Sequence, residues 1–448
     1  MENTFDNLKL TKQLRRALAD LELKTPTPIQ EKSFSVVLAG KDMVGIAQTG
    51  TGKTFAYLLP LLRELKYSTE TAPKVLVIVP TRELVIQVVE QAELLAKYMS
   101  ITILGVYGGT NINTQKRAVQ DKIDVLVATP GRLYDLALTK VLKLNSIKKL
   151  VIDEVDVMLD LGFRFQLTNI FEFLPKKRQN IMFSATMTAD IDALIDDFFT
   201  FPQKISIAVS GTPLDNISQK CYKVQNFNTK VNLLSYLLED RDEYSKVLVF
   251  TPSKKFADKI FEALEEKFDS EIGIIHSNKS QNYRLRSIKH FNEGENRILI
   301  ATDIMARGLD LEKISHVINF DTPEYPENYM HRIGRTGRAE EEGKSILFYT
   351  EKEEKAKKMI EVLMDYEIPE VEFPEEVEIT YELIAEERPR QKELNTRVKI
   401  DKTKGAAFHE KKDKNKKTNQ GGSYLRKMKV YKKPKTKGDK IQNRRKRK

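Results

Sequence analysis

The chain has 448 residues, of which 40% are hydrophobic, so it is long enough for two or three domains with cores of their own. No apolar run approaches the ~18 residues of a membrane helix, and the first residues lack the basic and apolar stretches of a secretory signal. Cys221 is the only cysteine, which excludes an intrachain disulfide and a cysteine metal site and fits a reducing cytoplasm.

The net charge of +11 is unevenly distributed along the chain. Residues 388–448 hold 25 Lys and Arg against 5 Asp and Glu, a net charge of +20, which leaves −9 for residues 1–387. Such a tail favours binding to nucleic acid through phosphates, although a tail that only keeps the chain soluble is the alternative. Because the tail has few apolar anchors, we expect it to be disordered.

The first part of the chain, about residues 1–207, predicts a parallel α/β domain. Its short apolar runs suit buried strands, and each is followed by a turn and a stretch compatible with a helix. These runs are Met43–Ile46, Val75–Val79, Val125–Ala128, Leu150–Ile152 and Ile181–Phe183.

After a predicted linker at 208–216, which contains Gly and Pro, a second series of apolar runs predicts another α/β domain at about 217–366. These runs are Val247–Phe250, Ile272–Ile275, Ile298–Ala301, Val317–Phe320 and Ser345–Tyr349. Residues 367–387 carry nine acidic side chains and no basic one, together with spaced apolar residues. We expect this segment to be extended and to lie on the second domain.

A loop at Ala47–Thr54 predicts a phosphate site. It reads Ala47-Gln48-Thr49-Gly50-Thr51-Gly52-Lys53-Thr54, follows a predicted strand, and departs from the general phosphate-loop pattern only in its first residue. Its glycines let backbone N–H groups point inward, and the start of a helix adds positive potential. We expect Lys53 to reach the outer phosphates of ATP and Thr54 to ligate Mg²⁺. A glycine-rich turn without a ligand is the alternative if the loop is taken alone.

An acidic cluster follows the predicted strand at Leu150–Ile152. In open α/β sheets ligands bind at the carboxyl ends of strands, so we expect Asp153 to face Mg²⁺ and Glu154 to deprotonate the attacking water. Asp156 completes the sequence Asp-Glu-Val-Asp. Together with the loop, these acids predict hydrolysis rather than nucleotide binding alone.

An arginine-rich segment in the second half supplies positive charge. It runs from His331 to Arg338 and spaces its arginines with glycines, which favours a shaped anion site over a solvated surface. We expect Arg335 and Arg338 to contact the ATP phosphates from the second domain, so that cleavage requires both domains.

These motifs resemble those of the DEAD-box ATP-dependent RNA helicases of the bacterial type, from about Phe5 to Tyr349. The resemblance implies two RecA-like domains in tandem. It implies that Gln30, in Thr25-Pro-Thr-Pro-Ile-Gln30, reads the adenine edge and that Phe5 stacks on the base. It also implies that Asp310 approaches the ribose and that His331 senses the nucleotide. Val155 stands where the family has alanine, and Glu22 and Leu23 stand where it often has glycine and an aromatic residue.

The resemblance also assigns residues to RNA and to coupling between the sites. Those implied in RNA binding are Thr81, Arg82, Gly109, Thr129, Arg132, Gln281, Arg284, Thr302 and Asp303. Those implied in coupling ATP state to strand separation are Asp156, Ser184, Thr186 and Arg307.

The function that follows is unwinding of short RNA duplexes and remodelling of RNA–protein complexes by a cytoplasmic monomer that uses ATP and Mg²⁺. Ribosome assembly, mRNA decay and cold adaptation stay open as settings. An ATP-gated RNA clamp with little net unwinding shares every motif and is the alternative. A DNA helicase is disfavoured by Gln30 and by Ser184-Ala185-Thr186.

Overall fold

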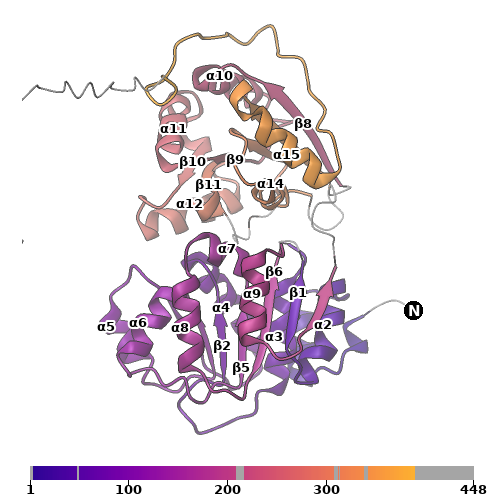
Figure 1. The fold of residues 1–448 in the computed structure, drawn as a ribbon, viewed down its shortest axis with the longest axis vertical. Helices are drawn as coiled ribbons and strands as arrows, with labels where there is room; N and C mark the ends of the chain where they lie inside the picture. Colours follow the sequence, from indigo (N-terminus) through magenta and orange to yellow (C-terminus); the bar gives the residue numbers. More distant parts are fainter. Residues whose placement is uncertain are drawn as a thin grey trace, which may run out of the picture. The chain divides into compact units, whose positions relative to one another are not determined.

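The computed structural model describes residues 4–47, 50–207, 216–306, 311, 313–337 and 342–388, apart from the side chain of Ile304. The residues up to Arg388 form one compact unit. It contains two parallel sheets, each covered by helices on both faces (Figure 1). In the described ranges, every helix is too short or too polar to cross a membrane.

Within the described residues, seven parallel strands form the first sheet, in the order β3-β4-β2-β5-β6-β1-β7. The strands are β1 (Met43–Ile46), β2 (Val75–Ile78), β3 (Ile103–Val106), β4 (Val125–Ala128), β5 (Lys149–Ile152), β6 (Gln179–Ser184) and β7 (Gln203–Ser206). Alternate residues of the central strands enter opposite cores, as the pleat requires: Val75 and Val77 face one side, and Leu76 and Ile78 the other.

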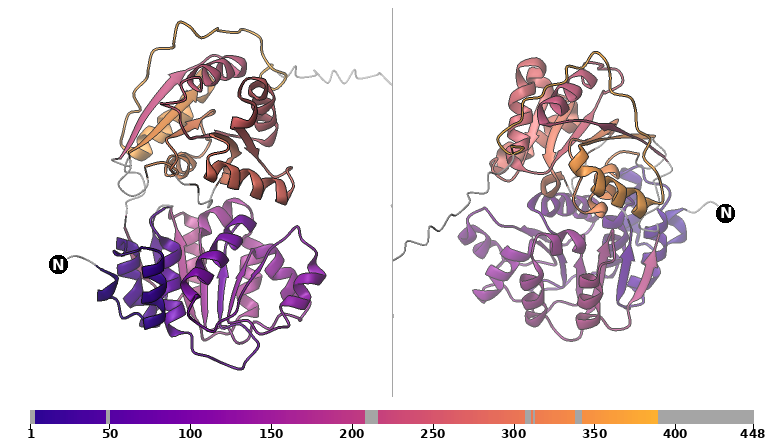
Figure 2. Two further views of the ribbon diagram at one scale, coloured as in Figure 1. Left: turned by 180° about the vertical axis from the view of Figure 1, so that it is seen from behind. Right: turned by 45° about the horizontal axis from the view of Figure 1, so that its top comes forward.

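Helices cover the two faces of the first sheet separately. One face packs against α1 (Lys12–Asp20), α2 (Pro28–Leu38), α3 (Lys53–Glu64) and α4 (Arg82–Ala96), preceded by the short 3₁₀ helix Phe5–Asn7. The other packs against α6 (Pro130–Leu138), α7 (Val155–Asp160), α8 (Arg164–Phe173) and α9 (Ala189–Phe198); α5 (Ile112–Ala118) is a short surface helix. Figure 1 shows α8 and α9 on the near face, and the view from behind in Figure 2 shows the indigo N-terminal helices on the other.

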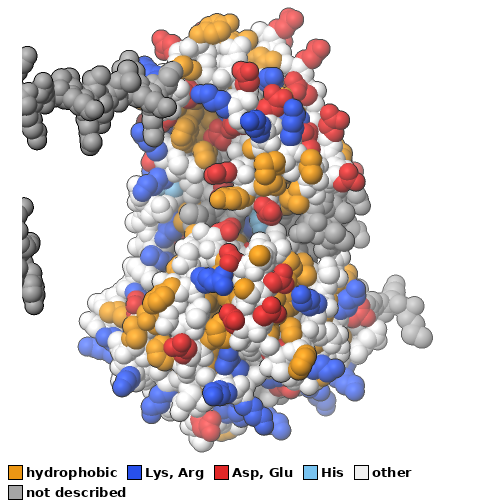
Figure 3. Space-filling view, in the orientation of Figure 1, with side chains coloured by type: hydrophobic (Ala, Val, Ile, Leu, Met, Phe, Trp, Pro, Cys, Tyr) orange, Lys and Arg blue, Asp and Glu red, His pale blue; other side chains and the backbone are white. Residues whose placement is uncertain are grey.

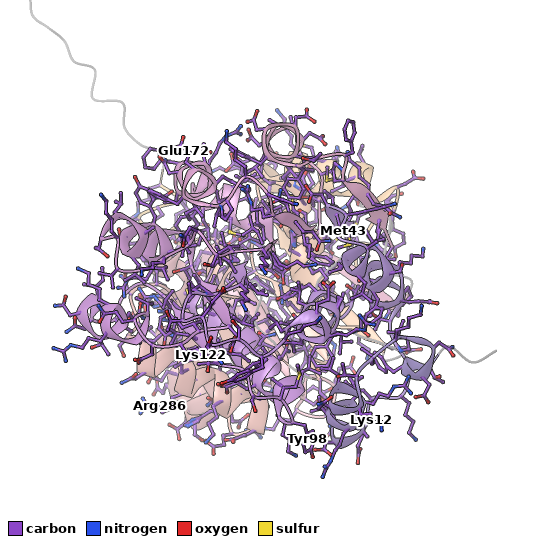
Figure 4. All side chains as sticks on the ribbon, turned by 90° about the horizontal axis from the view of Figure 1, so that it is seen from below. Lys12, Met43, Tyr98, Lys122, Glu172 and Arg286 are labelled. Carbon is purple, nitrogen blue, oxygen red and sulfur yellow. The ribbon has the colours of Figure 1, made fainter. Side chains whose placement is uncertain are left out.

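Helices α1 and α4 lie against each other at the rim of this half. Figure 4 shows Lys12 of α1 and Tyr98, just after α4, close together at the edge of the molecule. The Arg16 guanidinium stacks over the Tyr98 ring at 4.1 Å, and Lys97 forms an ion pair with Asp20. These contacts are on the surface, far from the buried residues of β1 such as Met43.

In the described part of the second half, six parallel strands follow the order β10-β11-β9-β12-β13-β8. They are β8 (Ile217–Lys223), β9 (Val247–Thr251), β10 (Ile272–Ile275), β11 (Ile298–Thr302), β12 (His316–Asn319) and β13 (Gly343–Tyr349). The helices are α10 (Phe227–Leu237), α11 (Lys254–Phe268), α12 (Gln281–Glu293), α13 (Asp303–Ala306), α14 (Pro326–Ile333) and α15 (Glu354–Met364), with 3₁₀ turns at Asp269–Glu271 and Glu351–Glu353.

The parallel α/β architecture predicted from the sequence is confirmed, and each predicted apolar run overlaps a strand. Three strands were not predicted: β3, β7 and β8. All three are edge strands. In β7 and β8 polar residues such as Lys204 and Lys220 interrupt the apolar run, as an incompletely buried edge allows. β3 is apolar but only partly buried, and β10, the other edge strand, is fully buried and was predicted.

Residues 367–388 run along the second half without a regular helix or strand. The Cys221 N–H donates to the Pro369 carbonyl at 2.8 Å, the Val371 N–H donates back to Cys221 at 2.9 Å, and Val377 is buried against the sheet. Glu386 forms an ion pair with Lys259 of α11 at 2.7 Å. Acidic side chains gather at the top of Figure 3, over this segment and α15. The segment therefore packs on the second half through both apolar and ionic contacts.

Candidate functional site

The phosphate loop lies between β1 and α3 at the carboxyl edge of the first sheet. Gly50 and Gly52 have φ angles of 83° and 85°, a left-handed conformation that favours glycine. A Cβ atom on Gly52 would lie 2.4 Å from the Gln30 side-chain nitrogen, so a larger residue there would displace Gln30 from the loop. Gln48 and Thr49 lie outside the described residues. The loop therefore has the tight path that the sequence predicts, at least from Gly50 onward.

The segment ending in Gln30 is tied directly to this loop. Thr27 Oγ1 donates to the Thr51 carbonyl at 2.8 Å, and Gln30 Nε2 donates to the Gly52 carbonyl at 3.2 Å. Gln30 Oε1 accepts from the Thr27 N–H at 3.0 Å, which caps α2. Thr27 and Gln30 thus hold the backbone of the loop at Thr51 and Gly52. These contacts could not be predicted from local sequence, because they join residues that are 24 and 22 positions apart.

Phe5 and Glu22 lie near the start of the chain, close to that segment. The Phe5 ring is buried in the core of the first half, and the Phe5 N–H donates to Lys24 at 3.1 Å. Glu22 has a φ of 56°, a left-handed backbone conformation that is strained for a residue with a Cβ atom. This explains physically why glycine suits that position in the resembling family.

The acidic cluster at the end of β5 lies beside the loop. The Asp153 N–H continues the sheet by donating to Ile78 at 3.0 Å, and Asp153 Oδ1 accepts from the Glu154 N–H at 3.0 Å. Glu154 has a φ of 53°, so the chain turns sharply here and both carboxyl groups stay buried. Burial raises the pKa of Asp153 to about 6, although the nearby Lys53 ammonium opposes the shift.

Two buried charged atoms in this region have no hydrogen-bond partner among the described residues: Lys53 Nζ and Glu154 Oε2. Both side chains are only 6% exposed. A buried charge without a partner is costly, so sites of this kind occur where a ligand completes the interaction. An anion beside Lys53 and a water beside Glu154 would satisfy both atoms.

Asp156 connects the first half to the second. Its Oδ2 accepts from the Ala185 N–H at 3.2 Å and from Thr186 Oγ1 at 3.4 Å, and His331 Nε2 lies 3.4 Å away. Although burial alone would raise it, the hydrogen bond and charge of His331 hold the pKa of Asp156 well below its usual range. Ser184 Oγ accepts from the Thr186 N–H at 3.3 Å. The predicted coupling residues other than Arg307 are thus assembled around one carboxylate.

The residues assigned to RNA in the first half lie at the carboxyl ends of β2, β3 and β4. Thr81 caps α4 by accepting from Leu84, and the Arg82 guanidinium lies so close to Gly109 that a Cβ atom there would be 2.0 Å from Nη1. Arg132 donates to the Thr110 carbonyl at 2.8 Å, and the Thr129 N–H donates to Val106 at 3.1 Å. The structure therefore gathers these residues along one sheet edge.

Glu83 brings two assigned residues of the second half to the same region. Gln281 Nε2 donates to Glu83 Oε1 at 3.1 Å, and Arg284 Nη1 lies 3.2 Å from the same oxygen. Glu83 and Arg284 are both buried. Glu83 belongs to the segment Pro80–Leu84 that the resemblance places along RNA, but no role was assigned to it individually. Its position directly after Arg82 could have indicated one.

In the second half, Asp303 begins α13 directly after Thr302 ends β11. Its carboxylate pairs with Arg332 through two hydrogen bonds of 2.5 and 2.8 Å, and Arg332 also donates to Asn319 and Asp321. Asp303 thus holds Arg332 in place. This ion pair was not predicted from the sequence. Arg335 is buried on the same segment. Arg307, Asp310 and Arg338 lie outside the described residues.

Comparisons with known proteins agree with this arrangement. Residues 27–194 match the model of the DEAD/DEAH box helicase family, and residues 229–340 match that of the helicase conserved C-terminal domain. The DEAD-box ATP-dependent RNA helicase CshA of Bacillus cereus is 38% identical over 386 residues, which is 86% of this chain and 73% of that protein. CshA of Bacillus subtilis is 37% identical over 361 residues, covering 81% of this chain and 72% of that protein.

A solved structure shows the same fold. The S. cerevisiae protein Dbp5, bound to RNA and ADP BeF3, superposes with a TM-score of 0.76 and 29% identity, over 82% of this chain and 95% of that chain. The two parallel sheets are therefore RecA-like, as predicted. The chain belongs to the DEAD-box ATP-dependent RNA helicases, which are ATP-hydrolysing enzymes.

Proposed function

We propose that this chain unwinds short RNA duplexes and remodels RNA–protein complexes, and that it does so with the residues assembled around Lys53 and Glu154. The observation that carries this proposal is the pair of buried, unpartnered atoms, Lys53 Nζ and Glu154 Oε2, beside a loop whose Gly52 has a left-handed φ of 85°. The phosphates of a nucleoside triphosphate supply the anion that would pair with Lys53. Glu154 then takes the proton of the attacking water.

ATP and Mg²⁺ are the proposed ligands of this site. No group of three or more His, Cys, Asp and Glu side chains within the described ranges could hold a metal ion by itself. This fits an ion that arrives with the phosphates, with Thr54 and Asp153 as its protein ligands. Mg²⁺ would neutralise phosphate charge there. Gln30 and Phe5 are proposed to select adenine, and Asp310 to approach the ribose.

The second half contributes to hydrolysis through its arginine segment. His331 reaches the Asp156 network, whose other members are Ala185 and Thr186. We therefore propose that the nucleotide state is transmitted through Asp156, with Arg335 and Arg338 stabilising charge on the phosphates. The proposed domain boundaries are 1–207 and 217–366, with the acidic extension at 367–387.

RNA is the proposed polymer, since Dbp5 in the matching structure is bound to it. The residues proposed to hold it lie at strand ends of both sheets, around the Arg82–Gly109 contact and around Glu83. Backbone contacts of this kind carry little base information, so sequence preference should be weak. We propose a cytoplasmic monomer whose targets include ribosomal or other ribonucleoprotein particles.

The test combines RNA-stimulated ATP hydrolysis with release of a short RNA strand from a duplex. In Glu154→Gln, turnover should fall ~10²–10⁴-fold while ATP and RNA still bind, because only the base is lost. Glu262→Gln, at an exposed position of α11, is the matched control and should act as wild type. Normal turnover in Glu154→Gln would exclude it as the base. ATP hydrolysis without strand release would favour the clamp, and equal stimulation by DNA would contradict RNA as the polymer.

A further inference from the structure

Tyr57 is a buried polar residue that the proposed mechanism does not use. It lies on α3, three residues after Thr54, and its side chain is 0% exposed. Its ring packs against Phe183 of β6, with ring centroids 5.7 Å apart and planes tilted by 47°. One turn of helix therefore separates Tyr57 from a proposed ligand of Mg²⁺.

The ring of Phe183, in turn, lies directly against Gly45 of β1. A Cβ atom on Gly45 would lie 2.6 Å from the Phe183 ring, so any larger residue there would displace the ring. Gly45 therefore packs against Phe183, and Phe183 packs against Tyr57. The Tyr57 hydroxyl lies beside Thr54 and Asp153, at the carboxyl edge of the sheet.

The Tyr57 hydroxyl is buried and makes no hydrogen bond of normal geometry to the described residues. The side chains nearest to this hydroxyl are those of Thr54 and Asp153, and Glu154 lies nearby. A buried hydroxyl without a hydrogen-bond partner is unfavourable, whereas phenylalanine would fill the same space without an unpaired polar atom.

Of Thr54 and Asp153, Asp153 is the better acceptor for a hydrogen bond from the Tyr57 hydroxyl. A carboxylate forms a charge-assisted hydrogen bond, whereas a threonine oxygen that ligates a cation has less capacity to accept. Asp153 Oδ1 already accepts from the Glu154 N–H, so a second donor would fix the carboxylate at two points. Groups that orient a metal ligand in this way typically change metal affinity ~10–100-fold when removed.

We propose that Tyr57 is a positioning residue for the magnesium site, whose hydroxyl donates to Asp153 and orients the carboxylate toward the ion. This inference rests on the proposed ATP–Mg²⁺ function of the loop. It assigns to α3 two tasks: Lys53 and Thr54 at its N-terminus contact the ligand, and Tyr57, one turn later, supports their partner on β5. Tyr57 acts through Asp153 and does not touch substrate.

The test measures the Mg²⁺ concentration at half-maximal binding of a fluorescent ADP, with thermal stabilisation by Mg²⁺–ADP as a second readout. Tyr57→Phe keeps the ring and should need ~10-fold more Mg²⁺, while ADP affinity in EDTA and RNA affinity stay unchanged. ATP turnover should recover at saturating Mg²⁺. Tyr329→Phe is the matched control, because Tyr329 is equally buried and donates to Gln219 at 2.9 Å in the second half.

An Mg²⁺ midpoint in Tyr57→Phe equal to that of wild type would overturn the proposal, even if the melting temperature fell. Replacing Tyr57 by 3-fluorotyrosine gives a stronger donor of nearly the same shape and should lower the midpoint. In an Asp153→Asn background, Tyr57→Phe should add nothing further, and an additive loss would also overturn the proposal. A wild-type protein whose nucleotide binding ignores Mg²⁺ would instead contradict the function of the loop itself.

Discussion

Each half of this chain buries a lysine, and the two lysines differ in what surrounds them. Lys230 of α10 is 2% exposed, and its ammonium lies 2.6 Å from Asp321 Oδ1 and 2.9 Å from Glu353 Oε2. Lys53 at the start of α3 is 6% exposed, and its ammonium has no hydrogen-bond partner among the described residues. Similar burial thus accompanies opposite degrees of pairing.

This difference indicates that Lys230 stabilises the fold, whereas Lys53 is placed to bind a ligand. Burial alone would lower the pKa of Lys230, but the carboxylates of Asp321 and Glu353 raise it above its usual value, so the group stays charged and ties α10 to two other segments. Lys53 interacts through space with the nearby carboxylates of Asp153 and Asp156, but its ammonium makes no hydrogen bond to the described residues. A bound anion would supply that missing contact, which is the behaviour expected of a phosphate-binding lysine.

The largest predicted effect of a substitution on stability is at Lys230. Lys230→Met removes the ammonium and leaves the partly buried carboxylates of Asp321 and Glu353 without their shared partner, so the free energy of unfolding should fall by about 3 kcal/mol. Urea unfolding measures this loss. Lys259→Met, which breaks the more exposed ion pair with Glu386, should cost less than about 1 kcal/mol. A loss at Lys230 as small as that at Lys259 would show that the buried pairing does not stabilise the fold.

The same substitution at the other buried lysine should give a different result. Lys53→Met removes an ammonium that makes no hydrogen bond to the described residues, so the unfolding free energy of the nucleotide-free protein should change much less than in Lys230→Met. Affinity for ATP should fall ~10²–10³-fold, because a charge-assisted contact with phosphate is lost. Isothermal titration with ATP and urea unfolding measure the two quantities. If Lys53→Met unfolds as easily as Lys230→Met, the contrast between the two lysines is wrong.

The sequence predicted much of this fold because its central strands are buried on both faces. Such strands must be continuously apolar, as Val75–Ile78 and Val125–Ala128 are, and they can be recognised without tertiary information. The edge strands β7 and β8 were missed because an exposed edge tolerates polar residues such as Lys204 and Lys220. Their identity depends on neighbours that are distant along the chain.

The site was predictable where one short segment carries the chemistry, and less so where two segments meet. Lys53 and Asp153 could be assigned from their own motifs. The pairing of Lys230 with Asp321 and Glu353, and of Arg332 with Asp303, joins positions that are far apart in sequence. No local pattern around Lys230 indicates that it will be paired, so its two partners became apparent only in the structure.

His316 extends the comparison to a residue that is buried in its neutral form. Its ring is 1% exposed, stacks 4.4 Å from Tyr244, and is flanked by Glu243, Lys344 and Lys220. Burial lowers its pKa to about 4, below the ~6.5 of an unfolded histidine. The unfolded state therefore takes up the proton first as pH falls, and the stability that His316 contributes above pH 6.5 is lost between pH 6.5 and pH 4.

His316→Gln should remove this pH dependence. In wild type the loss from this group should reach about 2 kcal/mol at pH 5, relative to neutral pH. Unfolding free energies of both proteins, measured in urea across this range, should converge as pH falls because the variant has no proton to gain. Parallel curves would mean that His316 is protonated equally in the folded and unfolded states.

The lysines and arginines of the basic tail form a third group of charges, and their removal is the smallest effect we predict. Deleting residues 389–448 should weaken RNA affinity ~10-fold at low salt and flatten the dependence of affinity on salt, since fewer counterions are released. ATP affinity should not change, because Lys53 and Glu154 lie in the first half. A tail of the same length with Gln in place of Lys and Arg controls for chain length and should behave like the deletion. If the slope against salt is the same with and without the tail's charges, RNA is held by the folded halves alone, and the large positive net charge then serves another purpose.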